Sequence, residues 1–459
     1  MTSGHPHTRS SPSVKAGHID VGLLIDSAGL NPLSKLVLAL ACLTSFMEGL
    51  DLSVISYVAP YIRDDLKLPA QSLGNVFSAS VLGMLIGGLA ISPLGDRFGR
   101  RPVIVFAGCA FALMSVLQVS TASYVYLLGV RFFLGLSVGA IGPLLTALAI
   151  EYAPQNLKIR FVGFMVMSYS LGAAASGPLT AAIAPELGWR AVFVVNGLLT
   201  AAAAVALLRF LPESIRFMVH SQAPASVIAS LVNRLAPATR ASEADRFVVC
   251  DERRDHDGAR ITDLLAGDLR FVTPMLWLGC AASAMAIYFN ASWGPIIYEG
   301  LSIERNAAAI FSSAASLSGA IAGLATTHLI DRRGVVSAIW FPLSAVPLLL
   351  VAGSGMLPPE YVIAFAVPAS VLLIAGHFGM ISIIGTYYPT AMRVRGIAWA
   401  TSIAKVGGAT GPAIGGNVMA AGIPLTSSYL LLAVCPIVVA LSLLAIAHRT
   451  AMSSTRLTQ

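Results

Sequence analysis

Charged residues are scarce in this chain. Asp, Glu, Lys and Arg together make up 11% of its 459 residues, whereas soluble globular proteins average about 25%. Hydrophobic residues make up 56% of the chain. This composition excludes a soluble globular protein.

Cysteine is also rare and its spacing carries no motif. The five cysteines are Cys42, Cys109, Cys250, Cys280 and Cys435, and no two of them are spaced as a metal-binding or redox pair would be. The sequence likewise has no phosphate-binding loop and no recognisable nucleophile and base. We therefore expect no enzymatic activity, no metal and no cofactor.

Apolar stretches long enough to cross a bilayer, which takes about 20 residues each, recur along nearly the whole chain. They lie near residues 34–58, 72–94, 102–120, 123–148, 160–184, 189–211, 271–293, 305–330, 334–354, 359–383, 394–421 and 426–447. Continuous apolar runs predict helices, because a membrane barrel would alternate apolar and polar residues. The fold class predicted is an all-α membrane protein with twelve transmembrane helices.

The two halves of the chain repeat one another at an offset of 235 residues. The matching residues are Tyr152, Pro154 and Arg160 with Tyr387, Pro389 and Arg395, and Asp96, Arg97 and Gly99 with Asp331, Arg332 and Gly334. Two homologous membrane halves in tandem are the architecture of a secondary transporter, whose central site opens to each side in turn. The predicted parts are an N-terminal tail (1–33), a six-helix half (34–211), a linker (212–270), a second six-helix half (271–447) and a C-terminal tail (448–459).

Basic residues crowd one side of the predicted membrane. Of the 29 Lys and Arg residues, 23 fall on one side, four on the other and two inside spans. By the positive-inside rule, the crowded side is cytoplasmic and includes both termini and the linker. The net charge of +7 therefore reflects topology in a cell membrane, and we expect a lipid bilayer rather than nucleic acid as partner.

Both the tail and the linker are expected to be loosely structured. The first 33 residues lack the apolar core of a cleaved signal peptide and are predicted to be a disordered tail. The linker is predicted to be a solvated tether with one or two short surface helices.

Ionisable residues inside spans are the candidates for function, since a lone charge at mid-bilayer costs roughly 3 kcal/mol or more. They are Glu48, Asp51, Arg131, His377 and Lys405.

Glu48 and Asp51 are three residues apart and share one face of the first span. Repulsion and desolvation favour protonation of one acid, which is what a proton-coupling site requires. By the helical rise, Asp51 lies about 10 Å from one membrane surface and Arg131 about 12 Å. We therefore predict that Glu48, Asp51 and Arg131 couple transport to protons; the alternative is a static ion pair.

Lys405 has no evident acidic partner in its own half, which suggests an anionic substrate as its partner. It is too deep in its span to reach the surface easily. His377 is either a relay or a packing residue. Aromatic side chains that are candidates for the walls of a substrate site are Trp293, Tyr288 and Phe378.

A short charged turn follows the second span. Its residues are Asp96, Arg97, Gly99, Arg100 and Arg101, and its repeat contains Asp331 and Arg332. The turn is too short to be a linker, and its charges can pair with neighbouring helix ends. We predict a gating loop, because membrane orientation alone would not require the repeated Asp and Gly.

These residues resemble the major facilitator superfamily over about residues 30–450. The features that carry the resemblance are the charged turn, Arg131 with Gly135 and Gly139, and Pro212, Glu213 and Arg216. Within that superfamily, the chain is most similar to the aromatic acid:proton symporters, through Glu48 with Asp51, Glu151 to Pro154 with Arg160, and Tyr388 to Arg393 with Gly396.

The resemblance implies that Glu48 and Asp51 form a paired acidic motif for proton-driven uptake. It also implies that Lys405 stands at a basic position and that Glu151, Arg160 and Arg393 make cytoplasmic charge contacts. The sequence departs from the family pattern in having Glu at 48 and Lys at 405. Lys cannot make the bidentate contact of Arg with a carboxylate, so the pocket is expected to differ in shape.

The function predicted is a proton-coupled importer of small organic anions, with aromatic carboxylates as substrates and a monomer as the working unit. The alternatives are a carrier for sugars or other metabolites, or a drug exporter driven by proton antiport. A membrane sensor that does not transport is a further alternative, but such proteins usually append a signalling domain.

Overall fold

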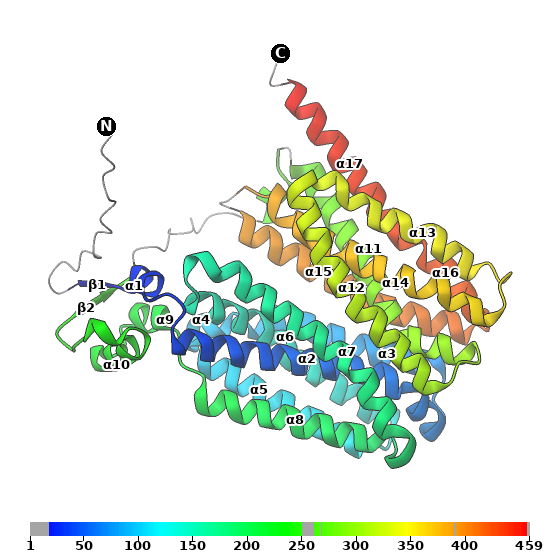
Figure 1. The fold of residues 1–459 in the computed structure, drawn as a ribbon, viewed down its shortest axis with the longest axis horizontal. Helices are drawn as coiled ribbons and strands as arrows, with labels where there is room; N and C mark the ends of the chain where they lie inside the picture. Colours follow the sequence, from blue (N-terminus) through cyan, green and yellow to red (C-terminus); the bar gives the residue numbers. More distant parts are fainter. Residues whose placement is uncertain (1–17, 250–260, 268, 390–391, 457–459) are drawn as a thin grey trace, which may run out of the picture.

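The computed structural model describes residues 18–249, 261–267, 269–389 and 392–456. The described part is a bundle of long helices in two halves (Figure 1), which confirms the predicted fold class. Residues 1–17 of the predicted tail and residues 250–260 and 268 of the predicted linker lie outside the described residues.

The N-terminal half contains six spans. Its helices are α2 (Pro32–Leu66), α3 (Ala70–Ile86), α4 (Leu94–Phe98), α5 (Arg100–Leu117), α6 (Tyr124–Tyr152), α7 (Lys158–Leu187) and α8 (Trp189–Phe210). A π-helical turn (Gly87–Ile91) joins α3 to α4, and these segments together make the second span.

The C-terminal half repeats this plan. Its helices are α11 (Leu269–Gly300), α12 (Arg305–Arg333), α13 (Trp340–Gly353), α14 (Pro359–Tyr387), α15 (Arg393–Ala420), α16 (Ser428–Leu432) and α17 (Val434–Arg456). Single 3-10 turns precede α13 (Val335–Ile339) and α16 (Leu425–Ser427).

Eleven of the described helical segments are long and apolar enough to cross a membrane. The one predicted span missing from these eleven is 394–421, which corresponds to α15 and has 28 residues but many glycines and alanines. It packs against α3 and α11, and small residues allow such close helix contacts in membranes. Its weaker apolar character therefore fits its place at an interface between helices.

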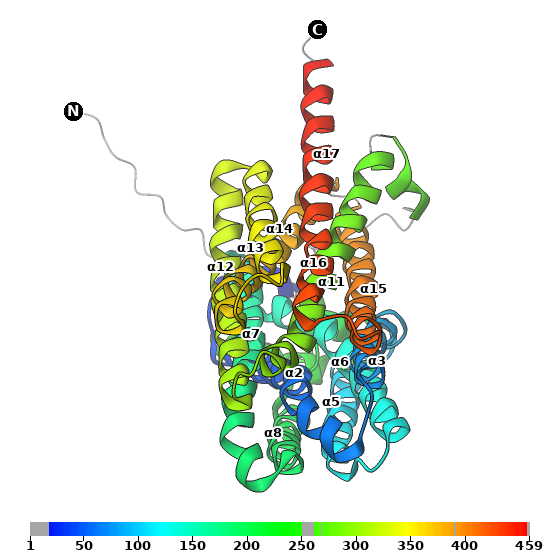
Figure 2. The ribbon, with the colours of Figure 1, turned by 90° about the vertical axis from the view of Figure 1, so that its right-hand side faces the viewer.

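The two halves meet through three helix pairs, α3 with α15, α7 with α12 and α2 with α11. We call the end of the bundle where residues 211–268 connect the halves the linker end, and the opposite end the far end. Figures 1 and 2 show the C-terminal half lying over the N-terminal half, and Figure 1 shows the halves diverging toward the linker end. At the far end the halves are joined by ion pairs such as Arg305 of α12 with Asp64 of α2, so the bundle is closed there.

The glycine of each charged turn has a positive φ, which explains why a glycine recurs at this position in the repeat. Gly99, between α4 and α5, has φ +99°, and Gly334, after α12, has φ +80°. Residues with a side chain rarely adopt these angles. The repeat therefore preserves a backbone turn at equivalent places in both halves.

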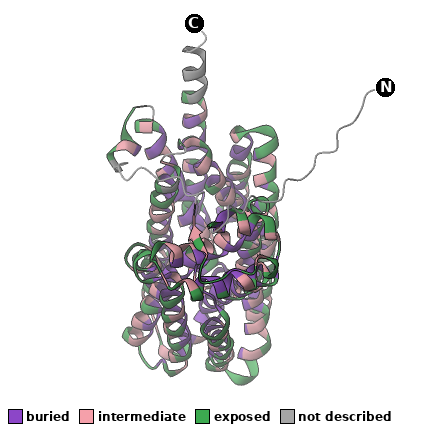
Figure 3. Cartoon of the chain, turned by 90° about the vertical axis from the view of Figure 1, so that its left-hand side faces the viewer, coloured by how far each residue is buried: buried purple, intermediate pink, exposed green. Residues whose placement is uncertain are grey.

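Many large hydrophobic residues are exposed, and the exposed positions lie on the outside of the bundle (Figure 3). Examples are Phe106 on α5 and Val125 on α6, which are 72% and 73% exposed. In water such a surface would be unfavourable, but in a bilayer it meets lipid.

The N-terminal tail is more ordered than predicted. Strand β1 (His18–Asp20) pairs in parallel with β2 (Arg246–Val248) of the linker, and Asp20 caps the helix α1 (Val21–Ala28) that follows. The linker also contains α9 (Ile215–His220) and α10 (Ala225–Leu235).

Burial of apolar residues explains this order. Val21 and Ile25 of α1 are buried, and α1 packs against α10. The prediction of a disordered tail is therefore wrong for residues 18–31, while the predicted short helices of the linker are present.

Candidate functional site

Lys405 reaches from α15 across the boundary between the halves. Its Nζ donates a hydrogen bond of 3.3 Å to the backbone carbonyl of Met84 on α3. A Cβ placed on Gly88 would lie 3.2 Å from Nζ, so a larger residue there would crowd the ammonium group. The side chain is partly exposed. Lys405 thus presents a cation to the opposite half.

Glu48 approaches Lys405 from the N-terminal half. It is 8% exposed on α2, and its Oε2 lies 3.9 Å from the place a Cβ on Gly142 of α6 would take. Glu48 and Lys405 are near enough to attract each other electrostatically. The two halves therefore bring opposite charges within electrostatic reach of one another.

Two tyrosines adjoin these charges. Tyr169 on α7 interacts electrostatically with both Tyr288 on α11 and Glu48, and both tyrosines are partly exposed. The Tyr288 ring packs on Gly408, where a Cβ would lie 2.7 Å from Cδ2. Gly408 is three residues from Lys405 and on the same helix face. We call Glu48, Tyr169, Tyr288 and Lys405 the central site.

Asp51 lies in different surroundings. It is fully buried, and its carboxylate accepts hydrogen bonds from Arg131 Nη1 at 3.0 Å, Ser115 Oγ at 2.6 Å and Asn196 Nδ2 at 2.5 Å. Gln118 Oε1 accepts a further bond of 3.2 Å from Arg131. This buried network joins α2, the end of α5, α6 and α8.

The structure therefore gives the two acids of the first span different partners. Asp51 forms an ion pair with Arg131, as the matched depths suggested. Glu48 instead interacts electrostatically with Lys405 across the boundary between the halves. A residue at this boundary can change its surroundings when the halves move, whereas Asp51 has its main charge partner, Arg131, in its own half.

Three of the four other predicted substrate residues, all in the C-terminal half, lie in separate surroundings. Tyr288 belongs to the central site. His377 forms a hydrogen bond of 3.0 Å with Ser283 Oγ inside the C-terminal half, and the Phe378 ring packs over Gly323.

Trp293 does not match the expectation of a wall near Lys405. It is fully buried, its indole N–H donates to the Pro412 carbonyl at 3.0 Å, and its ring meets Phe77 edge to face at 5.6 Å. Pro412 is seven residues beyond Lys405 on α15, about 10 Å along the helix. Trp293 thus belongs to the contact between the halves at the far end.

The charged turn packs onto its own half. Arg100 forms an ion pair with Glu151, and Glu213 accepts backbone hydrogen bonds from Arg100 at 3.0 Å and Arg101 at 3.2 Å. Glu151 also accepts from Ser214 Oγ. These bonds tie the turn to the ends of α6 and α8.

The other predicted gating and contact residues are mostly exposed. Asp96 and Arg97 are exposed, with the Arg97 guanidinium 5.3 Å from the Phe98 ring. The exposed residues also include Arg160, Asp331, Arg332 and Arg393. Arg393 Nε donates to the carbonyl of Tyr388 at 3.4 Å, within its own half. Their predicted gating and contact roles remain predictions.

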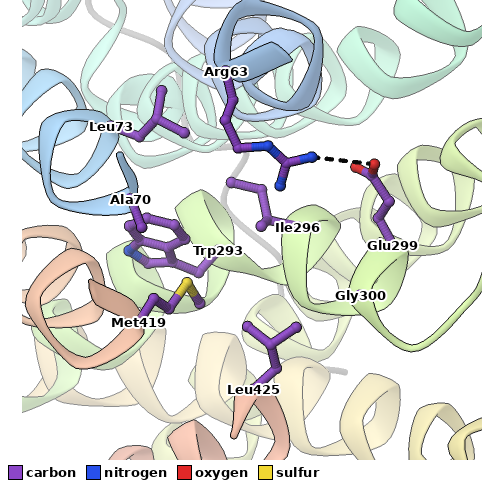
Figure 4. A pocket seen from close by; sticks show the side chains of 9 residues that line it. All are labelled: Arg63, Ala70, Leu73, Trp293, Ile296, Glu299, Gly300, Met419 and Leu425. Carbon is purple, nitrogen blue, oxygen red and sulfur yellow. Dashed lines mark ion pairs between the residues drawn. The ribbon is translucent and has the colours of Figure 1, made fainter. Parts of the chain in front are cut away.

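A cavity of about 240 Å³ lies between the halves at the far end (Figure 4). Its lining residues are Arg63, Ala70, Leu73, Trp293, Ile296, Glu299, Gly300, Met419 and Leu425. Beside it, ion pairs join the halves: Arg63 Nη2 lies 3.5 Å from Glu299 Oε1, and Arg305 Nη2 lies 2.9 Å from Asp64 Oδ2. We call Arg63, Asp64, Glu299 and Arg305 the far-end ion network.

No group of three or more His, Cys, Asp or Glu residues that could hold a metal occurs in the described ranges. The expectation that the protein needs no metal or cofactor remains a prediction.

Comparison with known proteins identifies the family. The family model described as Major Facilitator Superfamily matches residues 41–386. The chain belongs to this superfamily. A gallate transporter of Pseudomonas putida is 31% identical over 434 residues, covering 94% of this chain and 95% of the relative. A 4-hydroxybenzoate transporter of Pseudomonas aeruginosa is 29% identical, covering 90% and 92%.

Solved structures show the same fold in other superfamily members. A bacterial homologue of the human lysosomal transporter Spinster, in an inward-facing and occupied conformation, matches with a TM-score of 0.71 at 17% identity, covering 92% of this chain and 98% of that one. A D-xylose-proton symporter matches with a TM-score of 0.69 at 18% identity, covering 89% and 97%. As a member of this superfamily that is similar to aromatic acid transporters over most of its length, the chain is a multi-pass membrane transporter and not an enzyme.

Sequence reasoning missed two groups of residues. Tyr169 is a neutral residue within a span, and Asn196 is another; a search of the spans for uncharged polar side chains would have found both. The far-end ion network lies at span ends, which are ordinarily charged. No sequence signal singled it out.

Proposed function

We propose that this transporter imports small aromatic carboxylates together with protons. The observation that carries the proposal is the approach of Glu48 from one half to Lys405 from the other, with Tyr169 and Tyr288 beside them. The 31% identity to a gallate transporter supports the substrate class.

In this proposal, Lys405 binds the substrate carboxylate and the tyrosines contact its ring. A tyrosine offers both an apolar face for the ring and a hydroxyl that can bond ring substituents. Hydroxylated rings are thus favoured over rings without hydroxyl groups.

Proton coupling follows from competition for Lys405. While Glu48 is ionised, it attracts the ammonium group and repels a substrate carboxylate. Protonated Glu48 does neither, so the substrate becomes the counter-ion of Lys405. A proton and an anion then load together, and loss of the proton returns Glu48 to Lys405 and favours substrate release.

The linker end is proposed to face the cytoplasm, as the distribution of basic residues predicts. The protein then resides in the cell membrane with both termini inside, and substrate enters from the far end. Both charges of the central site come from one chain, so a monomer suffices.

The proposal can be tested with purified protein in liposomes. Labelled 4-hydroxybenzoate or gallate should accumulate when the outside is acidic, and a protonophore should abolish accumulation. Glu48→Gln should lose accumulation but retain exchange of labelled for unlabelled substrate, because exchange needs no net proton movement.

Lys405→Gln should lose both activities, and Lys405→Arg should retain part of them. A sugar and an aliphatic dicarboxylate serve as control solutes. Accumulation by Glu48→Gln equal to that of the unmodified protein would refute the role of Glu48. Uptake of the sugar rather than the aromatic acids would refute the substrate class.

A further inference from the structure

We propose that the far-end cavity is a second binding site for a small aromatic carboxylate, and that an occupant holds the halves closed there. This inference rests on the proposed function for the class of ligand. It differs from the central site in residues, in place and in consequence.

The cavity has the size and walls that an aromatic ring needs. Its volume of about 240 Å³ exceeds the roughly 150 Å³ of an apolar cavity known to bind benzene. The side chains of Leu73 and Ile296 come from opposite halves, and Met419 and Leu425 complete an apolar wall (Figure 4).

Arg63 supplies the cation that a carboxylate needs. Its Nε donates to Asp64 Oδ1 at 3.0 Å, and its Nη2 is 3.5 Å from Glu299 Oε1. Among the described residues, Nη1 has no hydrogen-bond partner. Figure 4 shows the guanidinium between Glu299 and Ile296, at the cavity. Arginine presents donors in a fork that matches a carboxylate.

Glu299 is not firmly held by Arg63. It accepts a shorter bond of 2.6 Å from Arg305 Nη2, and its other oxygen, Oε2, is buried with no hydrogen-bond partner in the part of the chain that the structure describes. An incoming carboxylate can therefore displace Glu299 from Arg63 while Glu299 keeps Arg305. Because the ligand adds a third carboxylate beside Glu299 and Asp64, we expect binding in the millimolar range.

An occupant of the cavity should affect transport, because the residues that line the cavity come from both halves. Ala70 and Leu73 belong to the N-terminal half, whereas Trp293, Met419 and Leu425 belong to the C-terminal half. The cavity exists only while the halves are closed at the far end, so an occupant stabilises that state. Excess external substrate should then slow the conformational change that reopens the central site toward the far end.

Two measurements test this inference. In the first, the initial rate of 4-hydroxybenzoate uptake is followed from micromolar to millimolar external concentrations. The unmodified protein should reach a maximum and then fall by about half, as a ligand that favours one state predicts. In Arg63→Gln, the ratio of the rate at high concentration to the maximum should stay near one.

Arg190→Gln is the matched control. Arg190 forms an ion pair of 2.9 Å with Asp65 at the same end, but within one half and outside the cavity. It should keep the decline seen in the unmodified protein. A decline that persists in Arg63→Gln, or no decline in the unmodified protein, would overturn the proposal.

The second measurement detects binding without transport. Met419→Cys, in a variant without the native cysteines, is labelled with a polar maleimide in detergent solution. Millimolar 4-hydroxybenzoate should slow labelling at least twofold, and Arg63→Gln should abolish this protection. Lys405→Gln should leave protection intact, because it alters only the central site.

The outcomes separate this inference from the proposed function. Protection that depends on Arg63 supports the second site even if no aromatic acid is transported. Two outcomes would refute the inference by assigning the ligand to the central site alone. One is transport with no protection of the cysteine at position 419 from labelling. The other is protection that is lost in Lys405→Gln but kept in Arg63→Gln.

Discussion

Arg305 Nη2 lies 2.9 Å from Asp64 Oδ2, and this contact joins α12 of the C-terminal half to α2 of the N-terminal half. The Arg305 guanidinium also lies 4.4 Å from the centre of the Tyr61 ring. One side chain of α12 therefore contacts both a carboxylate and an aromatic ring of the opposite half. These contacts must break before the far end can open.

We expect Arg305→Gln to shift the protein toward a state open at the far end. The pair is partly exposed, so its loss is worth about 1 kcal/mol, or about fivefold in the equilibrium. A cysteine at Leu73, which is 1% exposed, should react about fivefold faster with an impermeant maleimide in Arg305→Gln. Arg190→Gln removes a pair within one half and should leave the rate unchanged. Equal rates in both variants would contradict the assignment.

Much of the fold could be predicted because lipid restricts what a chain can do. Backbone groups in a bilayer must bond within the segment, so each apolar run predicts a helix and their number predicts the bundle. The repeat likewise predicts paired turns, since Gly99 and Gly334 both adopt positive φ. The order of residues 18–31 was not predictable, because it depends on burial of Val21 and Ile25 against a linker distant in sequence.

The candidate site could be predicted only in part. Rare charges inside spans identified Asp51, Arg131 and Lys405, because a buried charge is costly and needs a reason. Which acid faces which cation depends on how helices from the two halves pack. For that reason the sequence joined Glu48 to Asp51, whereas in the structure Glu48 interacts electrostatically with Lys405.

Asp51→Asn should destabilise the protein as well as impair uptake. The substitution leaves the Arg131 guanidinium, which is 1% exposed, without its counter-charge. Breaking a buried pair typically costs roughly 3–5 kcal/mol. The midpoint of thermal unfolding in detergent should fall clearly, and gradient-driven uptake should be lost.

The double variant Asp51→Asn with Arg131→Gln is the informative control. It removes both charges and should recover part of the lost thermal stability. An unfolding midpoint for Asp51→Asn equal to that of the unmodified protein would show that the pair is not structural.

Gly408→Ala should weaken substrate binding at the central site. The added Cβ would lie 2.7 Å from Cδ2 of Tyr288, so the ring must move. We expect the KM for 4-hydroxybenzoate to rise several-fold, since overpacking of this kind typically costs roughly 1–3 kcal/mol. Gly163→Ala is the matched control, because its added Cβ would meet, among the described residues, no atom within 4 Å apart from the chain neighbours and backbone of its own helix. A similar KM in both variants would remove Tyr288 from the site.

Val21→Asp should release the linker from the N-terminal segment. Val21 is fully buried in α1, whereas Leu23 in the same helix is 62% exposed. Replacing Val21 loses roughly 1.5–3 kcal/mol of apolar burial and buries a charge. Since α1 packs on α10 and β1 pairs with β2, the linker around Arg246 should open more often.

Cleavage by a protease follows the population of the open form, so trypsin should cut after Arg240 or Arg246 at least about tenfold faster in inside-out vesicles. Leu23→Asp adds the same charge on the exposed side and should leave cleavage unchanged; equal cleavage in both variants would mean that the N-terminal segment does not hold the linker.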